Sequence, residues 1–165
     1  MNTLPSVVWQ RLLTATQSHP HWHSRLLDWE SRQSGVTLHL VILREPYLSR
    51  ILSSRKRIES RFGRDRRLPF GRVHAGDILL LKRSGGPLAG LALVERAISR
   101  AITPTDVAEI QSVYGADLAI DDPGFWQNCF QSRYVTLAWM SEVFPLPAIP
   151  LPQQNRFGWL VVDSR

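Results

Sequence analysis

The pattern of apolar residues is helical before residue 35 and becomes strand-like after it. Within residues 5–33, apolar side chains recur at helical spacing. These positions are Val8, Leu12, Leu13, Trp22, Leu26, Leu27 and Trp29. Pro20 interrupts the segment, because proline cannot continue a helical hydrogen-bond pattern, and Gly35 is placed to end it. The pattern therefore predicts two helices, with tryptophans at positions typical of a core.

From Val36 onward the chain alternates between short apolar runs and turns. Residues 37–43 are apolar and rich in β-branched side chains, which is typical of a strand buried on at least one face. Further strands are predicted at 57–62, 77–83, 88–97, 134–142 and 157–162. Helices are predicted at 46–54, 103–114 and 122–130, and the proline-spaced segment 145–152 is predicted to be an extended connection.

Six short strands with helices between them predict an α+β fold. Short alternating strands leave exposed edges unless the sheet closes, so we expect a small mixed β-barrel, closed or nearly closed, with flanking helices. The length of 165 residues suits one ordinary domain with a short appendage. We expect an N-terminal helical extension at residues 1–35 and the barrel domain at residues 36–165.

Composition limits which structural sites and cellular locations are expected for the protein. Cys129 is the only cysteine, which excludes an internal disulfide and a cysteine-based zinc site. The first residues lack the basic and apolar regions of a secretory signal, and no apolar run approaches the length of a membrane span. We therefore expect a soluble cytoplasmic protein with no membrane partner.

The charge is concentrated in one segment. Residues 44–72 hold ten of the 20 basic residues against three acidic ones, a local balance of +7 in a chain whose net charge is +6. The cations are almost all arginines, whose planar forks suit phosphate oxygens and base edges. This clustering predicts a phosphate-bearing partner, with RNA or a nucleotide first and DNA possible.

The centre of this basic segment combines a turn with a strand. If Ile58 points inward, period-two alternation places Arg57, Glu59 and Arg61 together on the opposite face. Lys56 stands at the corner between the preceding helix and this strand. The spacing alone leaves three interpretations open: anion binding, catalysis, or a solvated edge strand with structural ion pairs.

The same corner suggests a reactive amine. Lys56 lies between Arg55 and Arg57, and two adjacent positive charges are expected to lower its pKa. A lysine with a lowered pKa can act as a base or a nucleophile. The candidate catalytic residues are therefore Lys56 and Glu59.

Several motifs in order resemble those of ASCH domains over residues 37–162. They are LVILREPY at 40–47, ILSSRKRIESR at 51–61, the Gly76-Asp77 turn and RYVTL at 133–137. The resemblance implies a PUA-like barrel with a charged cleft beside the helix at 46–54. Ser54 departs from the family, which usually has glycine there, so a slightly altered turn is expected.

For function, the resemblance implies nucleic-acid or nucleoside chemistry. PUA-like barrels are widely RNA-binding. One ASCH branch removes the acetyl group from acetylated cytidine, with a catalytic lysine that matches Lys56. Glu59 replaces the threonine of that branch, and its later glutamate has no clear match, Glu109 being the nearest. Another branch is described as a ribonuclease.

The sequence therefore supports three functions. The first is recognition of RNA or a nucleotide, the second is a hydrolase acting on acetylated cytidine or RNA in the same cleft, and the third is a protein-interaction module. The candidate binding residues are Arg44, Tyr47, Arg55, Arg57, Arg61, Arg64, Arg66, Arg67, Lys82 and Arg133. We expect no cofactor and no metal, since the histidine-rich residues 19–23 read better as a helix start. The oligomeric state stays open.

Overall fold

One six-stranded sheet organises the protein, in a computed structural model that describes residues 2–152 and 157–163. The strands are β1 (Leu38–Leu43), β2 (Ile58–Gly63), β3 (Ile78–Arg83), β4 (Leu88–Ala101), β5 (Tyr134–Ile149) and β6 (Trp159–Val162). Their order is β2-β5-β4-β3-β1-β6, with β1 and β3 parallel and every other pair antiparallel. The predicted α+β class and all six predicted strands are confirmed.

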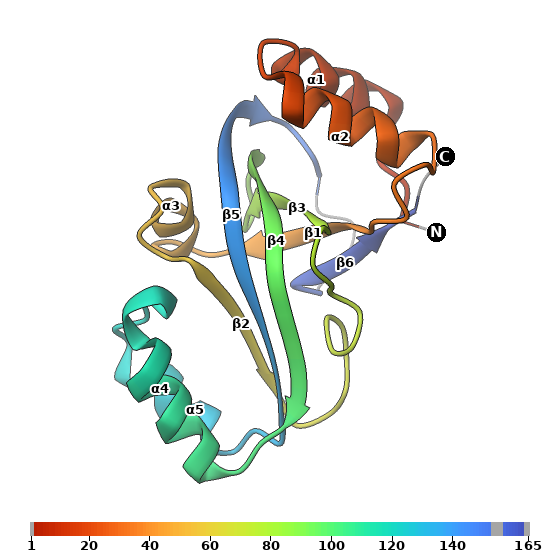
Figure 1. The fold of residues 1–165 in the computed structure, drawn as a ribbon. Coiled ribbons are helices and arrows are strands. Elements are labelled where there is room, and N and C mark those ends of the chain that lie inside the picture. Colours follow the sequence, from red (N-terminus) through yellow and green to blue (C-terminus); the bar gives the residue numbers. More distant parts are fainter. Residues whose placement is uncertain (1, 153–156, 164–165) are drawn as a thin grey trace.

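The sheet curls into a half-barrel with β2 and β6 as its edges. In Figure 1, β2, β5 and β4 run alongside one another, and β1, β3 and β6 cross them at a steep angle. The concave face buries Val41, Leu43, Leu79, Leu81, Ala92, Val94, Ala138 and Met140. Closure is therefore less complete than the sequence led us to expect, because β2 and β6 are not hydrogen-bonded neighbours.

Helices α1 (Ser6–Thr16) and α2 (Pro20–Glu30) cover one end of the sheet (Figure 1). Their buried tryptophans, Trp9, Trp22 and Trp29, join a core shared with β1, β3, β4 and β5. The indole Nε1 of Trp22 also donates to the carbonyl oxygen of Glu142 in β5 at 3.1 Å. The predicted core role of these tryptophans is confirmed, and the helical extension is built into the same core as the sheet.

The remaining helices differ from prediction mainly at their ends. They are α3 (Tyr47–Leu52), α4 (Pro104–Leu118) and α5 (Pro123–Cys129). A capping box between Thr103 and Asp106 starts α4, as the sequence indicates. The helix continues one turn past its predicted end, because Ile110 and Leu118 pack against the outer face of β2 and β5. None of the helices that the structure describes has the length and apolar character needed to cross a bilayer.

Two prolines lie inside β5 rather than in a connection after it. Pro145 and Pro147 belong to the far half of this strand, where β4 is its neighbour. The other neighbour, β2, pairs only with residues 134–139. Proline is tolerated where one side of a strand needs no ladder hydrogen bond, so the predicted extended segment becomes part of the sheet.

The shared core makes a testable difference between two adjacent leucines of α2. Leu26 is fully buried, whereas Leu27 is 41% exposed. Leu26→Ala should lower the free energy of unfolding by about 2–5 kcal/mol, because it opens a cavity in the core. Leu27→Ala should change it by no more than about 0.5 kcal/mol. Urea denaturation measures both; equal losses would contradict the packing of α2 on the sheet.

Candidate functional site

The end of α4 meets the basic segment. The last carbonyl groups of a helix have no partner within the helix and carry partial negative charge. Here three successive ones accept hydrogen bonds from α3 and from the chain between α3 and β2. The pairs are Arg57 N with Asp117 O at 2.7 Å, Lys56 Nζ with Leu118 O at 2.8 Å, and Arg50 Nη1 with Ala119 O at 2.7 Å. These bonds fix the corner on which Lys56 stands.

Lys56 is buried at this corner, with 2% of its surface exposed. Its Nζ lies 3.8 Å from Oε2 of Glu59 and 5.7 Å from the ring centroid of Tyr47. Burial is the main cause that lowers the pKa of Lys56; Glu59 opposes the shift, and Arg61 and Arg50 add to it. The pKa of Lys56 is lowered, as predicted. The predicted cause is wrong, because the shift comes mainly from burial and not from the exposed side chains of Arg55 and Arg57.

Glu59 and Arg61 form the second part of the site. Arg61 Nε donates to Oε1 of the buried Glu59 at 3.0 Å, and Nη2 donates to the carbonyl oxygen of Ile42 in β1 at 3.2 Å. The guanidinium also lies over Trp159 of β6, with Cζ 5.4 Å from the ring centroid. Arg61 thus spans the gap between the two edges of the half-barrel, and its side chain remains 30% exposed.

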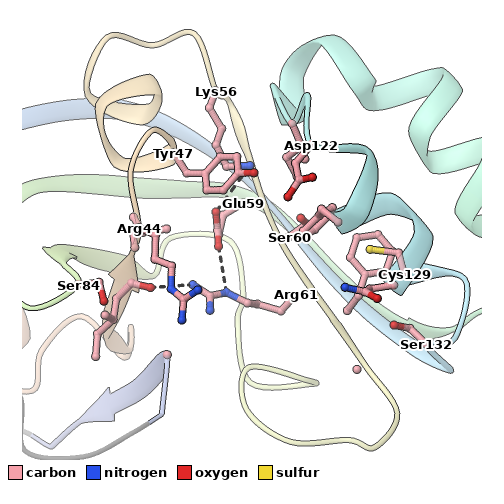
Figure 2. Close-up of a pocket in the computed structure, with 18 of the residues that line it drawn as sticks. Arg44, Tyr47, Lys56, Glu59, Ser60, Arg61, Ser84, Asp122, Cys129 and Ser132 are labelled. Atoms are coloured by element: carbon pink, nitrogen blue, oxygen red, sulfur yellow. Dashed lines mark hydrogen bonds and ion pairs between the residues drawn. The ribbon is translucent and has the colours of Figure 1, made fainter.

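These residues line a cleft of about 810 Å³. Figure 2 shows Tyr47 and Lys56 at one end, Glu59 and Arg61 near the middle, and Arg44 and Ser84 on one side. The opposite wall carries Ser60, Asp122, Cys129 and Ser132, and Asn128 also lines the cleft. The volume falls within the range of about 300–1,000 Å³ that is common for ligand sites.

Half of the candidate residues line this cleft, namely Arg44, Tyr47, Lys56, Glu59, Arg61 and Arg64. Glu59 and Arg61 share a face, as strand alternation predicts. Arg57 does not join them, because its backbone caps α4 and its side chain is exposed outside the cleft. Arg55 is likewise exposed at the turn.

Three further arginines lie near the far end of β2. Arg66 stacks on Phe70 and Tyr134, with Cζ 5.7 and 5.1 Å from the ring centroids. Arg67 pairs with Asp65 at 2.8 Å, and Arg133 is exposed just before β5. They lie outside the cleft but next to its end, since Arg64 lines it and Arg133 N bonds Gly63 O.

Lys82 does not face the cleft. Its Nζ donates to the carbonyl oxygens of Gly86 at 2.6 Å and Arg83 at 3.2 Å, inside the β3–β4 turn. The side chain is 1% exposed, and burial lowers its pKa. The sequence does not show to which side of the strand a lysine at the end of a leucine run points, and here its amine bonds to the carbonyl oxygens of the turn. The prediction that Lys82 contacts an anion gains no geometric support.

The sequence did not single out the opposite wall of the cleft. Asp122 begins α5 and accepts a hydrogen bond from Gly124 N at 2.9 Å, so the Asp-Pro-Gly start was a usable signal. Asn128 and Ser132 had no such signal in the sequence, because neither their spacing nor their charge distinguishes them from other polar residues. Cys129 is buried, which raises the pKa of its thiol to about 12 and keeps it protonated.

The turn before Lys56 keeps a glycine-like backbone despite its serine. Ser54 has φ of 60°, in the left-handed region that glycine adopts without strain. Ser54 therefore holds a backbone conformation that glycine adopts more readily.

Structural comparison identifies the fold. Solved structures of an ASCH protein from Zymomonas mobilis superpose on this chain with a TM-score of 0.61, at 16% identity over 76% of this chain and 87% of that one. The chain has an ASCH-type fold. A serine-to-alanine variant of the same protein matches with a TM-score of 0.61, and a tyrosine-to-phenylalanine variant with 0.55 at 18% identity over 69% of this chain. No protein-family model and no curated protein matches the sequence.

The ASCH-type fold confirms the predicted PUA-like architecture. It also explains where the cleft lies. The half-barrel leaves β2 as a free edge, and α3 and α5 stand on either side of that edge (Figure 1). The cleft therefore occupies the opening that an incomplete barrel leaves.

Burial of Lys56 predicts a pH dependence of stability. Its pKa is lowered from the ordinary 10.5, so the unfolded chain binds more protons between the folded-state pKa and pH 10.5. The free energy of unfolding, taken relative to Lys56→Met, should therefore rise with pH across that window. Urea denaturation at several alkaline pH values measures it. The free energy of unfolding relative to Arg55→Met should not change with pH across this window, since a guanidinium does not titrate there. A free energy relative to Lys56→Met that falls as pH rises would contradict the lowered pKa.

Proposed function

We propose that the cleft binds a nucleotide unit of RNA, with Arg61 contacting its phosphate. The position of Arg61 carries this proposal. Its guanidinium is oriented by Glu59 and by the carbonyl oxygen of Ile42, yet the side chain is 30% exposed within the cleft. These two bonds use two of the five N–H donors of an arginine. A guanidinium already held in place loses little freedom when it binds an anion.

The rest of the cleft suits a nucleotide in charge and in hydrogen bonding. Arg44 and Arg64 are exposed on its lining and add positive charge. Burial raises the pKa of Tyr47, and Asp122 and Asp121 add to the shift, so its hydroxyl stays a donor at neutral pH. Asp122, on the opposite wall, is an acceptor of the kind that pairs with amino groups on base edges.

A polymer is favoured over a free nucleotide by the surface next to the cleft. Arg66, Arg67 and Arg133 are exposed beyond the end of β2. Arg66 lies against Phe70 and Tyr134, and a surface of cations interleaved with aromatic rings is typical of single-strand binding. Further phosphates of an RNA strand that leaves the cleft would meet these side chains.

The proposal predicts salt-dependent RNA binding. A short fluorescein-labelled single-stranded RNA of mixed sequence should bind with an affinity that falls by about 0.7 log units per phosphate contact for each tenfold rise in salt. Combined Arg44→Ala and Arg64→Ala substitutions should weaken binding about tenfold or more and reduce that slope. Fluorescence anisotropy measures both.

Arg11→Ala is the matched control, because Arg11 is an exposed arginine on α1, away from the cleft. It should leave the affinity unchanged. A salt-independent affinity, or equal losses in the control and the double variant, would reject the cleft as the binding site. A DNA strand of the same sequence tests whether the 2′-hydroxyl contributes.

A hydrolase is the second candidate, and the environment of Lys56 favours it. Lys56 is enclosed, lies 3.8 Å from the Glu59 carboxylate and has a pKa lowered by burial. A neutral amine there can take a proton from a water or from a ribose 2′-hydroxyl. The activated water attacks the acetyl carbonyl carbon of an acetylated cytidine, the C–N bond breaks, and acetate and cytidine are released as the amino group takes the proton from Lys56. In RNA, the activated 2′-oxygen attacks the adjacent phosphorus, the P–O5′ bond breaks, and the departing 5′-oxygen takes that proton, which leaves a 2′,3′-cyclic phosphate. Tyr47 and Arg61 provide donors for the negative charge that develops.

Turnover separates the two candidates. Lys56→Arg keeps the charge but removes an amine that can deprotonate. A hydrolase should lose about a hundredfold or more in kcat, whereas a binder should lose little affinity. Deacetylation of acetylated cytidine and cleavage of the labelled RNA are followed by chromatography. Lys82→Arg is the control, since it makes the same change at another buried lysine outside the cleft. Absence of turnover in the native protein leaves binding as the function.

The protein-interaction alternative finds less support. It requires an exposed apolar patch. Among the described residues, the large apolar side chains that are exposed include Val7 on α1, Leu27 on α2, Leu68 in the loop before β3 and Val113 on α4. Phe130 at the end of α5 and Phe157 before β6 are exposed as well, so these exposed apolar side chains are spread over six separate segments.

A further inference from the structure

A buried polar cluster lies inside the half-barrel, next to Arg61. It consists of His39 in β1, Asp77 at the start of β3 and Trp159 in β6. Their exposed fractions are 0%, 3% and 3%. None of the three lines the cleft. Buried polar groups are costly unless every one is partnered, so such a cluster in an apolar barrel calls for an explanation.

The hydrogen bonds fix which nitrogen of His39 carries the proton. Trp159 Nε1 lies 3.1 Å from Nδ1 of His39, and an indole nitrogen can only donate. Nδ1 must therefore accept. The proton of the neutral ring then lies on Nε2, which donates to Oδ2 of Asp77 at 3.1 Å. Both nitrogens are satisfied, and the ring cannot rotate without breaking both bonds.

Asp77 anchors this chain of hydrogen bonds to the backbone. Its carboxylate also accepts from Thr37 N at 2.8 Å and from His74 N at 2.7 Å. Burial alone would raise the pKa of Asp77, but the hydrogen bonds from His39 and from these two amides outweigh it and lower the pKa. Asp77 is therefore a fixed, ionised end point for the cluster.

Trp159 connects the cluster to the cleft. The Arg61 guanidinium lies over its indole, and the His39 ring meets the same indole edge-on at a centroid distance of 5.8 Å. The neighbouring Gly158 leaves room for this arrangement, because a Cβ there would lie 2.7 Å from Arg61 Nη1. The guanidinium therefore rests against the indole as well as on Glu59 and the Ile42 carbonyl oxygen.

We propose that His39 and Asp77 are positioning residues, which hold the indole of Trp159 and through it the guanidinium of Arg61. This inference rests on the proposed function, in which Arg61 meets the phosphate. The contacts form one path from Asp77 through His39, Trp159 and Arg61 to Glu59, and Glu59 in turn faces Lys56. The path keeps the cleft's charged groups in one arrangement before a ligand arrives, which is how a preorganised site gains affinity.

The first test needs no ligand. Nuclear magnetic resonance follows the Nε–H of Arg61, identified by its loss in Arg61→Lys, and measures its exchange with solvent. His39→Phe and Trp159→Phe should each speed this exchange about threefold to tenfold, the effect of losing one hydrogen bond. The double variant should show no further increase, because both changes break the same path.

Leu79→Ala is the matched control. Leu79 is buried and pairs with His39 across β1 and β3, but its side chain takes part in none of the hydrogen bonds and ring contacts that make up the path. It should lower stability without changing the Arg61 exchange. If His39→Phe fails to fold, Trp159→Phe, which keeps an aromatic ring but removes the indole Nε1–H, decides the question. Native-like exchange of Arg61 in the folded variants overturns the proposal.

The second test measures binding of the fluorescein-labelled RNA. His39→Phe and Trp159→Phe should weaken binding about threefold to tenfold, while Leu79→Ala should not. Faster Arg61 exchange together with native affinity in both variants overturns the positioning role. If the variants show faster Arg61 exchange but the native protein binds no RNA at all, the proposed function is rejected instead. The link from His39 to Arg61 is then still supported.

Discussion

The end of α4 is the contact on which the candidate site depends. Its terminal carbonyl groups need donors. Arg50 of α3, together with Lys56 and the backbone of Arg57 in the segment that follows, supplies them. That contact removes the Lys56 amine from water and holds it beside Glu59. A basic segment that could have been a solvated loop becomes one wall of a cleft. The lowered pKa of Lys56 is a consequence of this burial.

The arginines of the basic segment divide into two groups with different tasks. Arg50 and Arg61 are held by partners: Arg50 pairs with Asp121 at 2.8 Å, and Arg61 is held by Glu59, Ile42 and Trp159. Others, such as Arg55, are exposed. Held guanidiniums define geometry, whereas exposed ones supply attraction that salt screens. A high local charge therefore says less about function than the distribution of partners does.

The half-barrel explains why binding chemistry gathers at one edge of the sheet. A closed barrel would have paired β2 and filled the opening, whereas here the edge strand borders a cleft between α3 and α5. Arg61 crosses from this edge to β1 and β6. The interior cluster of His39, Asp77 and Trp159 stands behind it. In this ASCH-type fold, the interior cluster therefore contacts the cleft through Trp159 and Arg61.

By itself, the sequence determined the six strands, the two N-terminal helices and the segment that carries the site, because periodicity and local charge are properties of neighbouring residues. It also placed Glu59 and Arg61 on one face, since alternation along a strand is local. Only the tertiary structure decided that Lys56 is buried and that Lys82 turns away from the cleft. The partner of Lys56, Leu118, lies 62 residues further along the chain. Such a contact depends on how whole elements pack, and no local pattern encodes it.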